Sequence, residues 1–178
     1  PAEINTLINA EYKNEELKTA VLLALCAGLR RGEVLGLQWG DIDMSNRTLT
    51  IRRSYAWFYG KGYIKPTKNR HERVLPINDV LYKHLKEIER IDENVIHLTP
   101  SFLTAGLPAF AEKIGIHRYS FHDLRRTFGT TMLQRGVDLK TCSILLGHQD
   151  VLVTSDFYVG IVDEMARNAV KEIDKIIE

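Results

Sequence analysis

The chain has 178 residues, the size of a single domain, and 44% of them are hydrophobic, which is enough for a buried core. Its formal net charge of +1 does not by itself indicate a nucleic-acid-binding protein, and its longest apolar run, near residues 20–28, is too short to span a bilayer. Cys26 and Cys142 lie far apart and outside any C-x-x-C pair, which argues against a disulfide framework or a zinc site.

The first part of the chain predicts helices. No signal peptide opens it, and the start at Pro1 without a methionine predicts that an N-terminal part is missing. Apolar residues at helical spacing predict a short helix over residues 2–10 and a mostly buried helix that begins after a capping Asn14 and ends at Gly28. A further short helical segment is expected over residues 33–37.

The middle of the chain has the period of strands. Residues 48–52 alternate and are rich in β-branched side chains, and residues 55–59 are expected to continue this strand. After a turn at Gly60-Lys61-Gly62, strands are expected over residues 63–65 and 73–77, with a polar, basic hairpin tip between them. Between residues 52 and 73 there are seven Lys and Arg against one acid, so this part predicts a local anion site despite the low net charge.

Helices are expected for the rest of the chain. They should cover residues 79–90, 100–114, 122–135 and 139–146, with Asp138 as the cap of the last of these. A short helix or turn over 150–158 and an amphipathic, acidic terminal helix over 162–177 should follow. The predicted fold class is α+β, mainly α, with one small antiparallel sheet.

The helix over residues 122–135 predicts an anion-binding face. Positions three and four residues apart share one side of a helix. One side is therefore expected to hold His122, Arg125, Arg126 and Gly129, and another, buried side to hold Phe121, Leu124, Phe128 and Met132. A cation and an imidazole at one spot suit a phosphate better than a carbonyl or a metal.

Further phosphate-handling groups follow one another along the chain in a recognisable order. A Gly-Leu-Arg-x-x-Glu motif contains Arg30, a lysine, Lys68, stands in the hairpin tip, and a His-x-x-Arg motif is formed by His122 and Arg125. Leu-Gly-His ends at His148, and Tyr158 comes ten residues later. This ordered set, which covers nearly the whole chain, resembles the catalytic domain of the tyrosine recombinases (phage integrase family). The spacing of ten residues between His148 and Tyr158 is similar to that in the integrases of conjugative transposons and many prophages.

The resemblance implies a chemical role for each of these residues. Tyr158 would attack the scissile phosphate and form a 3′-phosphotyrosine, with Lys68 as the general acid for the leaving 5′-oxygen. Arg30 and Arg125 would clamp the phosphate oxygens, because a guanidinium offers a bidentate fork that lysine does not. His122 would assist proton transfer at the tyrosine or hydrogen-bond the phosphate, and His148 would donate to a non-bridging oxygen. No metal or cofactor is expected, since the arginines supply the positive charge.

The resemblance also implies the surroundings in which this chemistry takes place. Residues 1–178 would be the catalytic domain, with residues 160–178 as a tail that subunits exchange, and the family's N-terminal core-binding domain would be absent. The partner would be double-stranded DNA, on which the protein forms a tetramer although it is a monomer alone. It would integrate or excise a mobile element in the bacterial cytoplasm, on the nucleoid and without a membrane.

Other interpretations of single residues stay open. Arg31 competes with Arg30, but the register of the Gly-Leu-Arg-x-x-Glu motif selects Arg30. Lys65 and Arg70 compete with Lys68, and counting back from residues 72–76 favours Lys68. In these alternatives Arg30 pairs with Glu33 on the next helical turn, His148 caps its helix, and Tyr158 is a core aromatic, as are Tyr12, Tyr82 and Tyr119. Arg126 is interpreted as a DNA-backbone or salt-bridge residue, and no further ligand at metal spacing accompanies His122 and His148. Two alternative functions are DNA relaxation of the type IB topoisomerase kind and a catalytically silent DNA-binding module.

Overall fold

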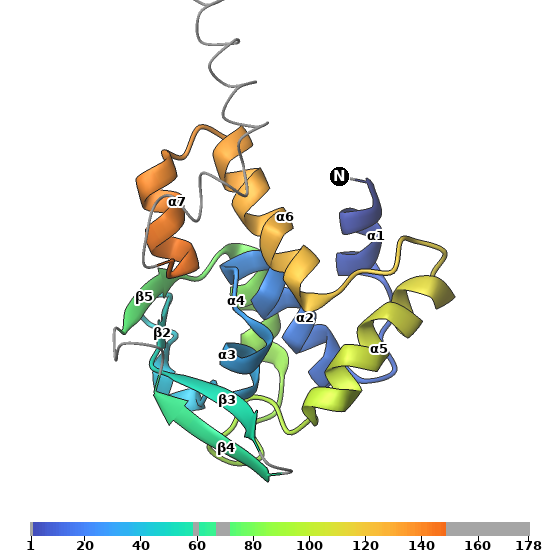
Figure 1. Ribbon diagram of the computed structural model, residues 1–178, viewed down its shortest axis with the longest axis horizontal. Coiled ribbons are helices and arrows are strands. Elements are labelled where there is room, and N and C mark those ends of the chain that lie inside the picture. The colour runs from blue at the N-terminus through green and yellow to red at the C-terminus, as the bar shows by residue number, and fades with distance from the viewer. Residues whose placement is uncertain (1, 59–60, 67–71, 149–178) are drawn as a thin grey trace, which may run out of the picture.

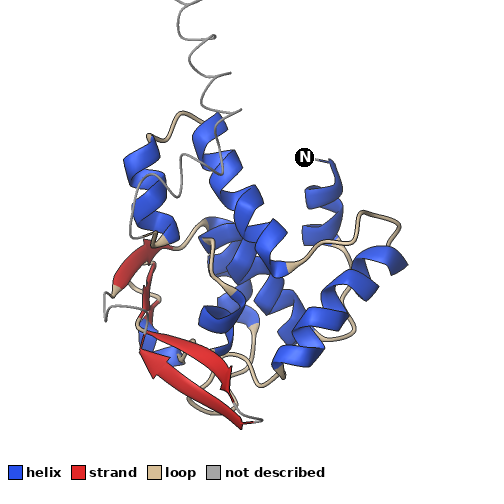
Figure 2. Ribbon diagram, viewed as in Figure 1, coloured by secondary structure: helices blue, strands red, loops and turns tan. Residues whose placement is uncertain are grey.

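The computed structural model describes residues 2–58, 61–66 and 72–148 (Figure 1). The hairpin tip with Lys68 and everything from residue 149 on, including Tyr158 and the expected terminal helix, lie outside the described residues. Helices dominate, and the strands gather on one side of them (Figure 2), so that a mainly α, α+β fold is confirmed. None of the helices in the described ranges is long and apolar enough to cross a membrane.

The helix α2 (Glu15–Ala27) forms the centre of the fold, because most of its residues are buried. It begins where the Asn14 side chain accepts a hydrogen bond from the backbone N–H of Leu17 at 2.8 Å, and it ends at Gly28, whose backbone is left-handed with φ 65°. Both expected ends are therefore confirmed. The helices α3 (Arg31–Leu35), α4 (Asp79–Glu87), α5 (Pro100–Lys113) and α6 (Phe121–Gln134) all contact α2.

The remaining helices follow the sequence closely. The first helix, α1, spans Ala2–Asn9, and α7 spans Leu139–Leu146 with Asp138 as its cap, as predicted. The segment predicted as helical over residues 33–37 starts two residues earlier and ends at Leu35. It starts there because Arg30 and Glu33 form a capping pair around the first turn, which brings Arg31 into the helix.

The strands form two sheets, and the prediction of a single sheet is wrong. The strands β1 (Ile42–Asp43), β2 (Thr48–Ile51) and β5 (Arg73–Pro76) make one antiparallel sheet in the order β1-β2-β5, and β3 (Arg53–Phe58) and β4 (Lys61–Pro66) make a separate hairpin. The expected continuous strand breaks at Arg52. The β2–β5 pairing ends at Ile51 opposite Arg73, and the chain beyond it pairs with β4 instead.

Two glycines of the α3 segment let the β3–β4 hairpin pack closely against the body of the protein. A Cβ atom added at Gly32 would lie 2.6 Å from Ser54 Oγ and 2.7 Å from the carbonyl oxygen of Tyr55. One added at Gly36 would lie 3.2 Å from the carbonyl carbon of Arg53. The hairpin therefore lies against the helix that directly follows Arg30.

The helix α6 joins two hydrophobic clusters. Its residues Phe121 and Leu124 belong to the main core around α2, whereas Phe128 and Leu133 belong to a small core shared with α7. Arg125 lies between these two sets along the helix and is itself buried. A buried arginine needs hydrogen-bond acceptors around its guanidinium group, and these acceptors define the candidate site.

Candidate functional site

Four of the residues predicted from the sequence meet at one pocket. The pocket has a volume of about 440 Å³ and lies between α3, α5, α6 and the end of α7. The polar and charged side chains at its wall include Arg30, Arg31, Thr104, His122, Arg125 and His148. The other two predicted site residues, Lys68 and Tyr158, lie outside the described residues. Lys65, the alternative to Lys68, is exposed on β4.

Arg30 precedes the first turn of α3 and is tied to it by Glu33. The backbone N–H of Arg30 donates to Glu33 Oε2 at 2.8 Å, and its Nη1 donates to Glu33 Oε1 at 2.9 Å. Its Nη2 donates to the carbonyl oxygen of Gly147 at 3.1 Å. The side chain remains 44% exposed. Arg31 also lines the pocket and donates to Thr104 Oγ1, but among the contacts of the described residues only Arg30 of this pair is bonded to Glu33.

Arg125 is buried, with 5% of its surface exposed. Its Nη1 donates to the carbonyl oxygen of Gly28 at 2.6 Å, and its Nη2 donates to the carbonyl oxygen of Leu146. Of the four residues expected on one side of this helix, His122 and Arg125 line the pocket, but the four differ in burial, and Arg125 and Gly129 are buried. His122 and Arg126 are exposed, whereas position 125 faces the ends of α2 and α7, whose carbonyl groups satisfy the buried guanidinium.

The buried carboxylate of Glu33 pairs with a third arginine that the sequence had not singled out. Arg73 donates from Nη1 to Glu33 Oε1 at 2.9 Å and from Nη2 to Glu33 Oε2 at 2.7 Å. Arg125 Nη1 is 3.9 Å from Glu33 Oε2. Burial alone raises the pKa of the Glu33 carboxyl, but the hydrogen bonds and charges of Arg73 and Arg30 outweigh it and lower that pKa to about 2. Glu33 is therefore ionised at neutral pH.

A sequence signal for Arg73 did exist. Alternate residues of a strand point to the same face, and Leu75 and Ile77 are apolar and buried. Arg73 continues this inward face, and its side chain is only 11% exposed. A charged residue on the inward face of a short strand indicates a buried ion pair. Arg73 was instead counted among the basic residues of the hairpin, so this ion pair was not predicted.

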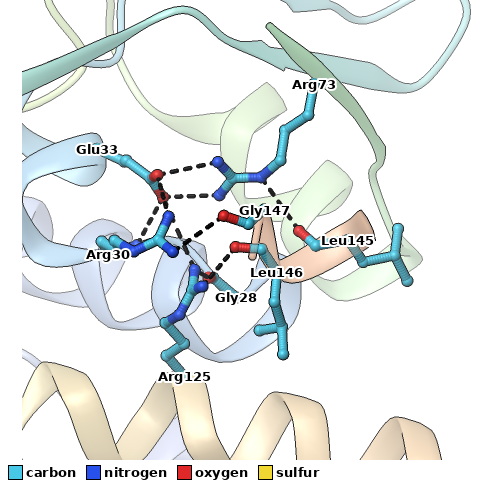
Figure 3. Close-up of polar contacts among 8 residues, drawn as sticks. All are labelled: Gly28, Arg30, Glu33, Arg73, Arg125, Leu145, Leu146 and Gly147. Carbon is cyan, nitrogen blue, oxygen red and sulfur yellow. Dashed lines mark hydrogen bonds and ion pairs between the residues drawn. The ribbon is translucent and has the colours of Figure 1, made fainter. Parts of the chain in front are cut away.

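The three arginines all donate to the carbonyl end of α7 (Figure 3). Arg73 Nε donates to Leu145 O at 3.1 Å, Arg125 to Leu146 O, and Arg30 to Gly147 O. The last carbonyl groups of a helix lack partners within the helix and carry partial negative charge. Guanidinium groups satisfy both needs. Figure 3 shows the same three groups converging on Glu33, so the helix end and the carboxylate form one network.

His148 follows directly on that helix end. Its backbone N–H donates to Ser143 O at 3.0 Å and so takes part in the helix cap, while its side chain lines the pocket. His148 therefore both caps α7 through its backbone and lines the pocket with its side chain. Burial, and then the charges of Arg125, Arg30 and Arg73, lower the pKa of His148 to about 4. Its imidazole is therefore neutral at neutral pH and offers one N–H donor and one acceptor nitrogen.

His122 reaches the pocket from the first turn of α6. That turn is fixed by Ser120 and Asp123, which bond each other's backbone N–H at 3.2 and 2.9 Å. The helix N-terminus favours negative charge beside it. Together with two arginines of the network and Arg31, this arrangement suits a phosphate group. Within residues 2–58, 61–66 and 72–148, no group of three His, Cys, Asp or Glu side chains is placed to hold a metal ion.

Comparison with known proteins gives a consistent result. The model of the phage integrase family matches residues 1–164. A tyrosine recombinase XerC-like protein of Caldanaerobacter subterraneus subsp. tengcongensis is 29% identical over 95% of the chain and 52% of its own length. The ICEBs1 integrase of Bacillus subtilis is 26% identical over 99% of the chain and 54% of its own length. The chain thus spans about half the length of these relatives.

Solved structures share the fold. The integrase of transposon Tn1549, in complex with transposon right end DNA, superposes with a TM-score of 0.78 at 20% identity, over 95% of the chain and 65% of the integrase chain. The XerA recombinase superposes with a TM-score of 0.74 at 19% identity, over 94% of the chain and 63% of the recombinase chain.

Proposed function

Since the chain belongs to the phage integrase family, we propose that it is the catalytic part of a tyrosine site-specific recombinase, which cuts and rejoins DNA to integrate or excise a mobile element. The observation that carries this proposal is the meeting of Arg30, His122, Arg125 and His148 at one pocket. These residues come from three separate regions of the sequence. The names of the relatives, recombinases and integrases, support the same reaction class.

In the proposed reaction the scissile phosphate occupies this pocket. The Tyr158 oxygen forms a bond to phosphorus while the bond from phosphorus to the 5′-oxygen breaks, and Lys68 gives that oxygen its proton. Arg30 and Arg125 donate to the non-bridging oxygens. Arg125 is already desolvated and held by Gly28 and Leu146, so it needs no reorganisation as charge develops. Neutral His148 donates its N–H, and His122 handles the tyrosine proton.

The 3′-phosphotyrosine keeps the energy of the broken phosphodiester. A 5′-hydroxyl from a second strand can therefore reverse the step onto a new partner, and no nucleotide cofactor is consumed. Double-stranded DNA is the proposed partner, and the bacterial nucleoid in the cytoplasm is the proposed location. Imaging a fluorescent fusion of the protein against a DNA stain tests that location.

Replacing Tyr158 by phenylalanine tests the reaction directly. The substrate is a duplex with the end sequence of the mobile element that encodes the protein, and it carries a nick beside the cleavage position. The short fragment released by cleavage diffuses away, so the covalent protein–DNA product accumulates. The protein is expressed at the full length of its natural reading frame. We expect a protein–DNA adduct that survives denaturing gel electrophoresis and that disappears in Tyr158→Phe, because the ring is kept and only the nucleophilic oxygen is lost.

A Tyr119→Phe variant is the matched control, since this half-buried tyrosine does not line the pocket and its hydroxyl donates to Glu3 Oε2 at 2.7 Å. It should form the adduct at the wild-type rate. An adduct that persists in Tyr158→Phe, or no adduct with the wild-type protein, contradicts the proposal. Relaxation of a single-site plasmid without recombination of paired sites would instead indicate topoisomerase-like activity.

We also propose that the protein assembles as a tetramer on two duplexes and that residues 160–178 dock on a neighbouring subunit. Two exposed apolar side chains support an acceptor surface near the end of the described chain. Val74 on β5 is 62% exposed and Ile144 on α7 is 60% exposed, and these two elements pack against each other. A surface that binds an apolar segment needs exposed apolar side chains such as these.

Ending the chain at Val159 tests the docked tail. If the tail covers an apolar surface, the shortened protein should unfold at a lower temperature and should form smaller complexes on DNA that carries two sites. The measurements are thermal unfolding and gel filtration, each with and without DNA. Identical unfolding temperatures and identical complexes for the two chain lengths would count against a docked tail.

A further inference from the structure

We propose that Arg73 is a positioning residue that keeps the guanidinium of Arg30 available to the phosphate by neutralising Glu33 in its place. The inference rests on the proposed function for its kinetic consequence. Its geometric content, the competition of two arginines for one buried carboxylate, stands on the contacts around Glu33.

The first step concerns the charge of Glu33. This residue is 3% exposed, and a buried carboxylate without a hydrogen-bonded cation is strongly unfavourable. Arg73 pairs with both carboxylate oxygens, at 2.9 and 2.7 Å, and is itself mostly buried. Arg125 stays 3.9 Å away. Arg73 is therefore the cation that principally balances this carboxylate.

The second step concerns what is left for Arg30. Its guanidinium gives Glu33 a single side-chain hydrogen bond, from Nη1, and gives Gly147 another, from Nη2. A guanidinium has five N–H donors, and the Arg30 side chain is 44% exposed at the pocket. The division of labour is thus clear. The buried Arg73 donates two hydrogen bonds to the carboxylate of Glu33, and the side chain of the exposed Arg30 donates one.

The third step concerns the other groups that Arg73 holds. Its Nε donates to Leu145 O at 3.1 Å, and a Cβ added at Gly147 would lie 2.8 Å from its Nη1, so the side chain lies directly against the residue before His148. Arg73 is also the first residue of β5, which follows the segment that contains Lys68. One side chain therefore links Glu33, the end of α7 and the start of the last strand.

The consequence of losing Arg73 follows from this arrangement. Glu33 would keep its burial but lose its fork of hydrogen bonds. Among the described arginines, the side chain of Arg30 also donates a hydrogen bond to Glu33, whereas Arg125 is 3.9 Å away. Arg30 would turn inward to pair with both carboxylate oxygens, and its donors would leave the pocket. Removing the charge of Glu33 should remove the reason for this movement. A rescue of Arg73→Ala by Glu33→Gln is therefore the signature of positioning.

The kinetic test compares wild type, Arg73→Ala, Glu33→Gln and the double variant in single-turnover cleavage of the nicked duplex, with protein in excess and well below each variant's unfolding temperature. We expect Arg73→Ala to lower the rate constant by about 100-fold, the order of loss for a misplaced catalytic group. The double variant should cleave about tenfold faster than Arg73→Ala. Arg73→Lys, which keeps the charge but not the fork, should fall between wild type and alanine. A double variant no faster than Arg73→Ala would overturn the proposal.

A crystal structure of Arg73→Ala separates this inference from the proposed function, because it requires no cleavage. Arg30 should then approach both Glu33 oxygens to about 3 Å, and in the double variant it should return to its original position. If the alanine variant does not fold, the structure of Arg73→Lys answers the same question, since one ammonium group leaves part of the carboxylate to Arg30. An unmoved Arg30 in these structures would overturn the inference even if the wild type cleaves DNA, and a moved Arg30 would support it even if no cleavage is seen.

Discussion

Replacing Arg125 by lysine is expected to reduce DNA cleavage by at least about 100-fold, because the loss of one preorganised donor to a developing oxyanion typically costs that much. Lysine keeps the positive charge but has a single ammonium group. It does not reproduce the fork that joins Gly28 O at the end of α2 to Leu146 O at the end of α7. The measurement is the single-turnover rate of adduct formation at saturating protein.

The same substitution should also lower stability, because position 125 is buried and its two acceptor carbonyls lose their donor. An unsatisfied buried carbonyl costs roughly 1–3 kcal/mol. For a domain of this size a loss of about 2 kcal/mol lowers Tm by roughly 4–8 °C. Arg126→Lys is the control on the neighbouring, exposed position, with an expected change within about 0.5 kcal/mol. Equal rates for Arg125→Lys and wild type would refute the proposed role of Arg125.

Replacing Gly28 by alanine should be among the most destabilising small substitutions in the protein. Gly28 has φ 65°, and a left-handed backbone costs a non-glycine residue roughly 1–2 kcal/mol. The new Cβ would also lie 2.6 Å from Cδ1 of the buried Phe128 ring, and overpacking of this kind typically costs about 1–3 kcal/mol. We therefore expect a loss of roughly 2–5 kcal/mol in the free energy of unfolding, measured by urea denaturation.

Gly115→Ala separates the two contributions. Gly115 also has a positive φ, of 75°, but an added Cβ would meet nothing within 4 Å. It should therefore lose only the backbone part, about 1–2 kcal/mol. Phe128→Leu in the Gly28→Ala background should recover part of the difference by making room. Equal losses at Gly28 and Gly115 would mean that the Phe128 ring moves aside without cost. Because Gly28 O accepts from Arg125, cleavage should fall with Gly28→Ala but not with Gly115→Ala.

The helices could be predicted from the sequence because their signals are local. Asn14 and Asp138 are capping residues followed by apolar periods, and each accepts the backbone hydrogen bond expected of it. The sheet was harder, since the partner of a strand is set by distant pairing. Residues 48–52 alternate and residues 55–59 were expected to continue their strand, yet the four-residue β5 offers partners only as far as Ile51, and β3 pairs with β4 instead.

Part of the candidate site could be predicted from the order of motifs along the chain. Arg30, His122, Arg125 and His148 were chosen from the order of motifs along the chain, and the structure brings these four to one pocket. Their environments could not be predicted. The burial of Arg125 depends on two helix ends that meet only in the folded chain, and the role of Arg73 depends on a carboxylate forty positions away. For Lys68 and Tyr158 the motif order remains the basis of the prediction.

The separation of the two sheets has a consequence for how this protein tolerates changes in length. The β2–β5 ladder ends at Ile51 and Arg73, and the strands β3 and β4 between them pair with each other as a separate hairpin. Lengthening a surface loop lowers the stability of the protein only slightly, by about 0.6 kcal/mol for each doubling of the loop length. Insertions beyond Arg52 can therefore be accommodated while Arg73 keeps its register opposite Ile51. A change in the length of this hairpin is therefore expected to leave Arg73 paired with the carboxylate of Glu33.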